Sequence, residues 1–273
     1  MRADGGKSVG GDGSGRTILD VRGVRHVYGT GPGAHEAVAD LTFSVDSGEF
    51  ISIVGPSGAG KSTLLRILSG LLRPTEGEVI LDGTRVAGVP EGIAMVFQDY
   101  SRSLLPWLTV ERNVAFPLRK PSISKQDRQQ RVQESLAAVG LAQHGDRFPW
   151  QLSGGMQQRV AIARAMAYRP RLMLMDEPFA SVDAQTRAEL EDLTLRIRRD
   201  YDMTILFVTH DIDESVYLAD RVVVLSRPPA RLLDNIVVDL PAERDQITTR
   251  EIDTFVHLRG KVARMIRSGE ADH

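Results

Sequence analysis

The sequence predicts an α/β fold with a mainly parallel β-sheet core, an N-terminal antiparallel β layer and a helical insertion. Three observations lead to this prediction. Short and nearly continuous apolar runs, typical of strands covered on both faces, alternate with helical patterns. Near the N-terminus the runs instead alternate apolar and polar residues and have turn residues between them, as a small antiparallel layer does. From Gln98 to the region of Leu152 the chain is polar and helical, with prolines at 106, 117, 121 and 149.

The individual elements follow from these patterns. The antiparallel layer is predicted at Ile18–Val27, Leu41–Val45 and Glu78–Leu81. The core strands are predicted at Phe50–Val54, Leu172–Met175, Ile205–Val208 and Arg221–Leu225. The insertion covers about residues 99–166 and contains a helix at Lys125–Val139. We assign residues 1–16 to a glycine-rich disordered tail, residues 17–245 to one domain that includes the insertion, and residues 246–273 to a C-terminal helical extension.

The composition excludes several classes of function. The 34 lysines and arginines nearly balance the 36 aspartates and glutamates, so we expect no nucleic-acid partner. The chain has no cysteine and therefore no disulfide, thiolate metal site or thiol nucleophile. No apolar run approaches the ~20 residues that cross a bilayer, and the N-terminus lacks the apolar segment of a secretory signal. We therefore expect a chain that works in the cytoplasm and does not itself span a membrane.

A glycine-rich loop follows the strand predicted at Phe50–Val54. Its residues are Gly55, Pro56, Ser57, Gly58, Ala59, Gly60, Lys61, Ser62 and Thr63. The strand–loop–helix setting is that of a P-loop, whose amide hydrogens and following helix N-terminus hold phosphate oxygens. Lys61 is expected to reach the β- and γ-phosphates, and Ser62 to ligate Mg²⁺. The loop thus predicts a nucleotide-binding P-loop NTPase core of the RecA-like kind, the alternative being a glycine-rich turn before an ordinary helix.

Two carboxylates end the strand predicted at Leu172–Met175. Asp176 and Glu177 lie at the carboxyl end of a parallel strand, where α/β sheets bind ligands. We expect Asp176 to hold magnesium through water, and Glu177 to orient and polarise the water that attacks the γ-phosphate. The alternative is a solvated junction between strand and loop, but the position of the pair after a P-loop favours the catalytic interpretation.

Two polar residues follow other predicted strands. His210 comes after Ile205–Val208, so it reaches the same edge of the sheet and can donate a hydrogen bond to the γ-phosphate. Its alternative role is to cap or pack the following helix. Gln98 ends the apolar run Ala94–Phe97 at the junction with the insertion. We expect Gln98 to lie beside the metal, to sense the γ-phosphate and to relay its presence to the insertion.

A second glycine-containing helix start lies between Leu152 and Arg159, where the sequence reads LSGGMQQR. Ser153 can cap this helix, whose N-terminus would favour a phosphate. With the P-loop, the glutamine, the acidic strand and the histidine in this order, the segment resembles the ATP-binding-cassette (ABC) ATPases, whose signature reads LSGGQ. Met156 replaces the final glutamine, a departure common enough in that family to leave the assignment intact. The resemblance covers nearly the whole chain from about Ile18 onward.

The resemblance implies that two copies of the chain close around two ATP molecules. Ser153, Gly154 and Gly155 would then touch the nucleotide bound by the P-loop of the partner. Asp183 matches the aspartate that links the two sites across the interface. Tyr28 fits the aromatic residue that stacks on adenine, an arrangement that an aromatic platform favours; its alternative role is core packing beside the neighbouring valine.

A single cassette without a spanning segment resembles the ATPase of a bacterial importer at the cytoplasmic face of the membrane. Integral-membrane permease subunits and, indirectly, a solute-binding protein would be its partners. The segments Leu104–Val114 and Pro228–Asp245 resemble the nitrate, sulfonate and taurine importers. Three alternatives stay open: a non-transport ABC-class ATPase, a binding module without hydrolysis, and an ABC subunit for another solute. We expect Leu104–Trp107 to line a groove for a permease helix, unless these residues pack the core of the insertion.

Overall fold

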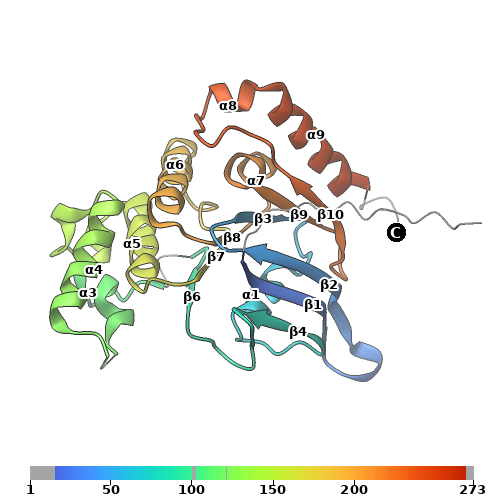
Figure 1. Cartoon of the computed structure of the whole chain (residues 1–273), viewed down its shortest axis with the longest axis horizontal. Helices are drawn as coiled ribbons and strands as arrows, with labels where there is room; N and C mark the ends of the chain where they lie inside the picture. The colour runs from blue at the N-terminus through green and yellow to red at the C-terminus, as the bar shows by residue number, and fades with distance from the viewer. Residues whose placement is uncertain (1–15, 100–102, 121, 269–273) are drawn as a thin grey trace, which may run out of the picture.

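The structure, a computed structural model, describes residues 16–99, 103–120 and 122–268. In this part of the chain the strands form two sheets, and helices surround the second of them (Figure 1). The first sheet has the order β2-β1-β4-β5, with antiparallel pairing throughout. Its strands are β1 (Thr17–Tyr28), β2 (His35–Asp46), β4 (Glu76–Leu81) and β5 (Thr84–Arg85). The predicted N-terminal antiparallel layer is therefore confirmed.

The second sheet is the core of the molecule and has the order β10-β9-β3-β8-β7-β6. Its strands are β10 (Leu232–Val237), β9 (Arg221–Leu225), β3 (Phe50–Val54), β8 (Ile205–Thr209), β7 (Leu172–Asp176) and β6 (Ile93–Val96). All neighbours pair in parallel except β10, which runs antiparallel to β9 at the edge. The predicted parallel core is thus confirmed, and β10 is an additional strand that the sequence analysis did not identify.

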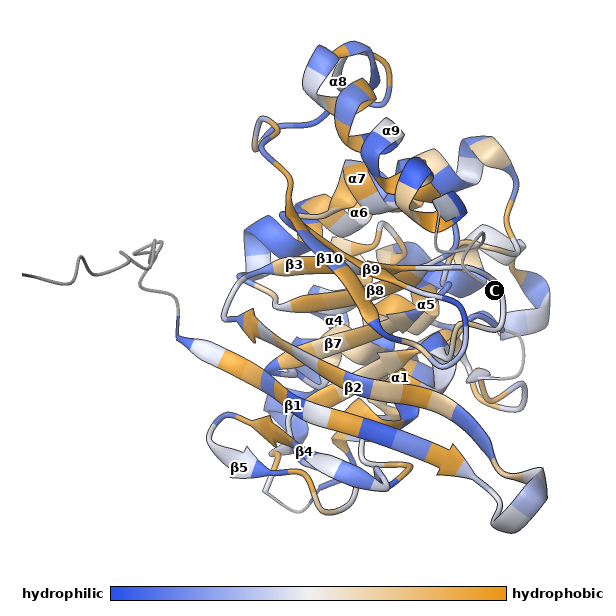
Figure 2. Cartoon of the chain, turned by 90° about the vertical axis from the view of Figure 1, so that its right-hand side faces the viewer, coloured by the Kyte–Doolittle hydropathy of each residue, from blue (hydrophilic) through white to orange (hydrophobic). Residues whose placement is uncertain are grey.

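The core sheet is buried on both faces, as the continuous apolar runs predict. Figure 2 shows strands β3, β7, β8 and β9 as largely hydrophobic. Phe50 and Phe207 belong to a cluster on the face covered by the helices, whereas Ile51 and Leu206 belong to a second cluster on the face covered by β1, β2 and β4. Alternate residues of one strand therefore stabilise different layers, and each core strand is held from both sides.

The helices complete the fold. They are α1 (Lys61–Leu68), α3 (Val110–Ala115), α4 (Lys125–Ala138), α5 (Gly154–Ala167), α6 (Ala184–Tyr201), α7 (Ile212–Leu218), α8 (Thr248–Glu251) and α9 (Asp253–Ser268). Helices α3, α4 and α5 pack on one another and form a lobe beside the core (Figure 1). None of the helices in the described ranges is long and apolar enough to cross a bilayer.

The two ends of the described chain are attached to the fold. The backbone carbonyl of Arg16 accepts a hydrogen bond from the amide of Ser47 at 2.8 Å, so Arg16, the last residue of the predicted tail, contacts the fold. Residues 1–15 of the predicted tail lie outside the described residues. At the other end, α9 packs on α7 and β9 through buried Phe255, Leu258 and Val262.

Candidate active site

The predicted site residues follow four strands that are neighbours in the core sheet. In the order β3, β8, β7 and β6, the carboxyl ends lead into the P-loop, His210, the Asp176–Glu177 pair and Gln98. Because these strands are parallel, their carboxyl ends lie at one edge of the sheet, which is where open α/β sheets bind ligands. The topology therefore collects residues that are more than a hundred positions apart in the sequence.

The P-loop connects β3 directly to helix α1. Lys61 is the first residue of α1, and Gly60 precedes it with a left-handed backbone (φ 79°). A Cβ atom at Gly60 would lie 2.5 Å from the backbone oxygen of Ala37, so both the backbone angle and the close approach of β2 require glycine. The N-terminus of α1 consequently opens onto the loop, as phosphate binding requires.

The amino group of Lys61 is held inside this loop. Its Nζ atom donates hydrogen bonds to the backbone oxygens of Gly55 (2.7 Å) and Pro56 (2.9 Å), and the side chain is buried. Burial lowers the pKa of Lys61, while the nearby charges of Glu177 and Asp176 oppose that shift. The lysine is therefore a cation placed between the loop and the acidic pair.

Asp176 and Ser62 form an oxygen-rich pair next to the lysine. Ser62 is the second residue of helix α1, and Asp176 is the last residue of β7. Burial raises the pKa of Asp176, as does the charge of Glu177, whereas Lys61 and the Ser62 hydroxyl act to lower the pKa of this carboxylate. A hydroxyl and a carboxylate are the hard oxygen ligands that Mg²⁺ prefers, so the donor set fits this metal.

Glu177 and His210 contact each other across the ends of β7 and β8. His210 Nδ1 lies 2.9 Å from Glu177 Oε2, and the Glu177 amide donates to the backbone oxygen of Val208 at 2.9 Å. Glu177 has a left-handed backbone (φ 43°), which costs about 1–3 kcal/mol for a residue with a side chain. Such strain gathers at functional sites, and here it turns the carboxylate of Glu177 toward the histidine.

Gln98 and Tyr28 border the same region. Gln98 lies two residues beyond β6 and its side chain is exposed. Tyr28 ends β1, and its hydroxyl lies 3.2 Å from the Thr63 hydroxyl in helix α1. Its ring packs edge-on against His26 and stays 38% exposed, so one face is open to a ligand. Tyr28 is therefore a partly exposed ring and not a member of either hydrophobic core cluster.

The signature segment lies on a different part of the fold. Ser153 caps helix α5, because its hydroxyl accepts a hydrogen bond from the amide of Met156 at 3.3 Å, and Gly154 and Gly155 form the first turn. Helix α5 packs against α3, α4, α6 and β6, whereas the P-loop helix α1 packs against β2 and β7. Within one chain, the signature helix α5 and the P-loop helix α1 therefore pack against different elements of the fold.

Asp183 caps helix α6 beside the start of α5. Its carboxylate accepts hydrogen bonds from the amide (3.0 Å) and the hydroxyl (2.7 Å) of Thr186, which lower the pKa of Asp183. The Thr186 methyl group faces Gly155, where a Cβ atom would lie only 2.4 Å away. The glycine thus allows helices α5 and α6 to approach closely, and the signature and Asp183 are neighbours.

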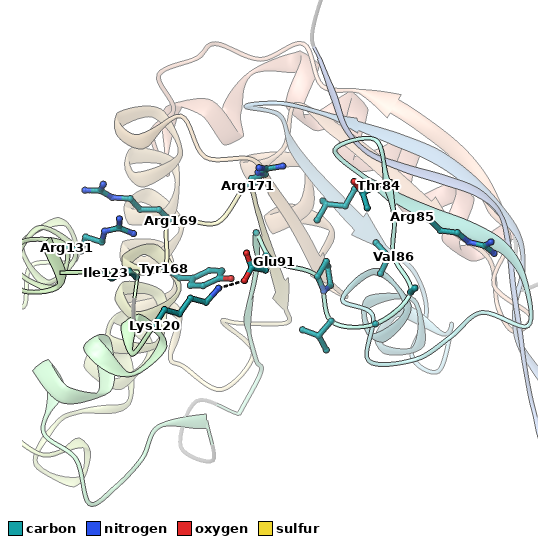
Figure 3. A pocket seen from close by; sticks show the side chains of 16 residues that line it. Thr84, Arg85, Val86, Glu91, Lys120, Ile123, Arg131, Tyr168, Arg169 and Arg171 are labelled. Carbon is teal, nitrogen blue, oxygen red and sulfur yellow. Dashed lines mark hydrogen bonds and ion pairs between the residues drawn. The ribbon is translucent and has the colours of Figure 1, made fainter. Parts of the chain in front are cut away.

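A cavity of about 640 Å³ lies away from this site, between the core and the insertion (Figure 3). Gly92 and Arg171 line it, and each directly precedes a core strand, so the cavity adjoins the amino ends of β6 and β7. Its charged lining residues are basic except for Glu91, which pairs with Lys120 at 2.7 Å. This cavity is consequently distinct from the predicted nucleotide edge.

Two features near the site were not identified from the sequence. Phe116 and Pro117 line an apolar groove of about 320 Å³ beside the edge strand β6. Such a groove was predicted at Leu104–Trp107, but Leu104 is buried in the core of the insertion, and Trp107 is 70% exposed without lining this groove. The second feature is a polar bridge between α6 and α7, which depends on a contact between residues distant in sequence and so leaves no local pattern.

Comparison with known proteins identifies the family. The family profile described as ABC transporter matches residues 38–180. The chain is 46% identical to the aliphatic sulfonates import ATP-binding protein SsuB 1 of Xanthomonas axonopodis, over 81% of this chain and 87% of that protein. It is 39% identical to the nitrate transport protein NasD of Klebsiella oxytoca, over 90% and 95% of the two chains.

A solved structure agrees with these relatives. The ATP-binding cassette MJ0796, a dimer bound to ADP and Pi in a post-hydrolysis state, superimposes with a TM-score of 0.70 and 32% identity. The match covers 81% of this chain and 99% of that one. In this chain the P-loop, the signature segment, the acidic pair and the histidine follow one another in the order expected from the resemblance to that family. The protein belongs to the ATP-binding subunits of ABC transporters and is an ATP hydrolase.

Proposed function

We propose that two copies of this chain close around two ATP molecules at the cytoplasmic face of the membrane and drive an importer through separate permease subunits. The observation that carries the proposal is the separation of the P-loop helix α1 from the signature helix α5 within one chain. A helix N-terminus is a ready anion site, and a second copy can bring its signature to the nucleotide on this chain's P-loop.

The roles at the carboxyl edge follow from charge and position. Lys61 neutralises charge on the β- and γ-phosphates, and Ser62, Asp176 and Gln98 would hold Mg²⁺. Bound Mg²⁺ supplies further neutralisation of the phosphates. Glu177 orients and polarises the attacking water, and the contact with His210 holds its carboxylate in place. The Tyr28 ring supports the adenine.

The partner subunit completes each site. In this proposal Ser153, Gly154 and Gly155 of one copy meet the γ-phosphate held by the other, and Asp183 reaches the same interface. Hydrolysis then requires two chains, because in this proposal each nucleotide lies between the P-loop of one copy and the signature of the other. The contact between Gly155 and Thr186 keeps the signature and Asp183 in a fixed relation as they approach the partner subunit.

The transported solute is proposed to be a small anion such as nitrate or an organic sulfonate, delivered by a solute-binding protein. Support comes from relatives that are named for the import of aliphatic sulfonates and for nitrate transport and align over most of their length. A non-transport role is less consistent with these relatives. Direct measurement of uptake by the assembled transporter, with nitrate, taurine and bicarbonate compared, tests the choice of solute.

The permease is proposed to dock in the apolar groove beside β6. Ala94, Met95, Phe116 and Pro117 line it from the edge strand and the insertion, and Phe116 remains 43% exposed. Strand β6 lines the groove and ends two residues before Gln98. In this proposal the γ-phosphate sensor and the docking surface therefore lie close together along the chain, where β6 leads into the insertion. Rotation of the insertion on dimer closure would move a helix held in the groove as a rigid body.

The test of the catalytic proposal is Glu177→Gln, which removes the charge of the water-orienting group and keeps its shape. ATP should still bind, hydrolysis should stop, and dimers should accumulate because they cannot turn over. ATPase rate and mass in solution with ATP and Mg²⁺ check this expectation. Turnover close to that of the wild-type chain would remove Glu177 from the proposed role.

The docking proposal is tested by co-expressing this chain with candidate permease subunits of the same organism and purifying the complex that forms. Phe116→Ser should abolish co-purification with the permease and leave the ATPase rate of the isolated subunit unchanged. Tyr201→Ser is the matched control, because Tyr201 is a similarly exposed aromatic residue (47%) on α6, away from the groove. Equal association of the two variants would exclude the groove as the docking site.

A further inference from the structure

A polar bridge joins the start of helix α6 to the start of helix α7. Arg187 lies one turn after Asp183 on α6, and its side chain reaches two acidic residues of α7. Arg187 Nη1 lies 3.5 Å from Asp211 Oδ2, and Arg187 Nε lies 3.6 Å from Glu214 Oε1. Both distances are longer than those of strong hydrogen bonds, so the two contacts are loose ion pairs.

The acidic side of the bridge is tied to the end of strand β8. The Thr209 hydroxyl donates a hydrogen bond to Glu214 Oε2 at 2.6 Å and accepts one from the Asp211 amide at 2.9 Å. Thr209 is the last residue of β8, and His210 follows it directly. A displacement of Glu214 or Asp211 is therefore passed to the backbone that carries His210.

Glu214 is unusual for a residue without a catalytic assignment. It is 5% exposed, although glutamate is rarely buried unless it is paired. Arg187 is the cation that faces it, Asp211 and Glu191 are the nearby anions, and Thr209 is its hydrogen-bond donor. The Nε atom of Arg187 is buried and makes no hydrogen bond. A small approach of α6 toward α7 would convert the open ion pair into a charge-assisted hydrogen bond.

We propose that Arg187 and Glu214 are positioning residues, which transmit the position of Asp183 at the dimer interface to His210 at the chain's own nucleotide. The inference rests on the proposed dimer, in which Asp183 faces the partner subunit. Movement of the first turn of α6 tightens Arg187 onto Glu214 and Asp211, and these residues fix Thr209, His210 and, through His210, Glu177. The state of the neighbouring site thereby sets the geometry of hydrolysis in this one.

The experiment compares Arg187→Gln, Glu214→Gln and the double variant in the full chain. Each single variant should lower kcat about tenfold, because a misplaced catalytic group loses rate while the ligand contacts remain. The KM for ATP should stay within about twofold of wild type, and the Glu177→Gln background should still dimerise with ATP. The double variant should lose no more than either single variant, since all three break one bridge.

Arg250→Gln is the matched control. Arg250 pairs at 2.8 Å with Glu191, which is buried like Glu214 but lies on α6. Arg250 does not touch the end of β8. This variant should lower the melting temperature about as much as Arg187→Gln does, but it should keep its kcat within about twofold of wild type. If Arg187→Gln does not fold, Arg187→Lys, which keeps the charge but loses the fork of donors, replaces it and should show the same fall in kcat at unchanged KM.

The outcomes separate the two proposals. A fall in kcat for Arg187→Gln that does not exceed that of Arg250→Gln, or additive losses in the double variant, would overturn the positioning role. A wild-type chain without ATPase activity, or a Glu177→Gln chain that does not dimerise with ATP, would instead overturn the proposed function on which it rests.

Discussion

His210 Nδ1 lies 2.9 Å from Glu177 Oε2, so a side-chain contact joins the ends of β7 and β8 in addition to their backbone pairing. Glu177 has a strained left-handed backbone, and its carboxylate therefore depends on a neighbour for its orientation. In the proposed function the histidine thus has two tasks, one toward the γ-phosphate and one toward the Glu177 carboxylate.

Replacing this histidine should damage turnover much more than binding. For His210→Ala we expect kcat to fall by about 100-fold or more, because an orienting group and a phosphate contact are both lost. The affinity for ATP should change little, since Lys61 and the P-loop remain. Single-turnover hydrolysis and equilibrium binding of a fluorescent ATP analogue measure the two quantities, and equal losses in both would contradict this division.

Lys61→Ala should show the opposite pattern. The substitution deletes a charge-assisted contact to the phosphates, so ATP affinity should fall by about 10- to 100-fold. Two internal hydrogen bonds to Gly55 and Pro56 are also lost, and melting temperature without ATP must be compared to separate loss of folding from loss of binding. ATP-driven dimerisation of the Lys61→Ala chain at wild-type ATP concentrations would argue against the assignment.

Gly155→Ala should separate the starts of helices α5 and α6. The new methyl group would lie 2.4 Å from the Thr186 methyl carbon, and Thr186 is fixed by the Asp183 carboxylate. Overpacking of this kind costs about 1–3 kcal/mol. Urea unfolding and ATP-driven dimerisation should both weaken. Adding Thr186→Ser, which removes the methyl group and keeps the hydroxyl, should restore both, and a failure to restore stability would show that the clash is not the cause.

Glu214→Gln should change how stability depends on pH. Burial raises the pKa of Glu214 to about 7, whereas a glutamate in an unfolded chain titrates near 4.3. Between these values the folded chain keeps a proton that the unfolded chain releases, so this residue's contribution to stability is present below about pH 4 and is lost as pH rises through 7. Arg187, Asp211, Glu191 and Thr209 face the carboxyl group and set its pKa.

Comparing the wild-type protein with the Glu214→Gln variant gives the size of this pH-dependent contribution to stability. Relative to Glu214→Gln, the wild-type chain should lose roughly 3 kcal/mol of unfolding free energy between pH 4 and pH 8. Urea unfolding at several pH values measures the difference. Parallel stability curves for the two chains would show that Glu214 does not titrate in this range.

The sequence predicted the elements whose patterns are local. The buried strands at Phe50–Val54 and Ile205–Val208 appear as continuous apolar runs because both faces of the core sheet are covered. Strand β10 was missed because Leu232–Val237 contains Asp234 and Asn235, which an edge strand tolerates and a buried strand does not. Helix α5 begins at Gly154 with Ser153 as its cap, as the serine before the two glycines predicted, because capping outweighs the low helix propensity of the glycines.

Features that depend on packing could not be predicted from sequence. The bridge from Arg187 to Glu214 joins residues that the chain places on two helices, and no periodic pattern marks such a pair. Leu104 and Trp107 are three residues apart, yet one is buried and the other is 70% exposed. Which side of a short irregular segment faces the core depends on neighbouring helices, whose positions a single sequence does not fix.

The insertion has a simple topological description. It begins where β6 ends and finishes where β7 begins, and these two strands are parallel neighbours. Residues 97–171 are therefore one enlarged crossover connection, with α5 in the place of the single helix that usually joins two such strands. A crossover must carry the chain from the carboxyl end of one strand back to the amino end of its parallel neighbour. The lobe on which we propose that the permease docks can accordingly vary in length and surface while the four strand ends at the proposed nucleotide site keep their register.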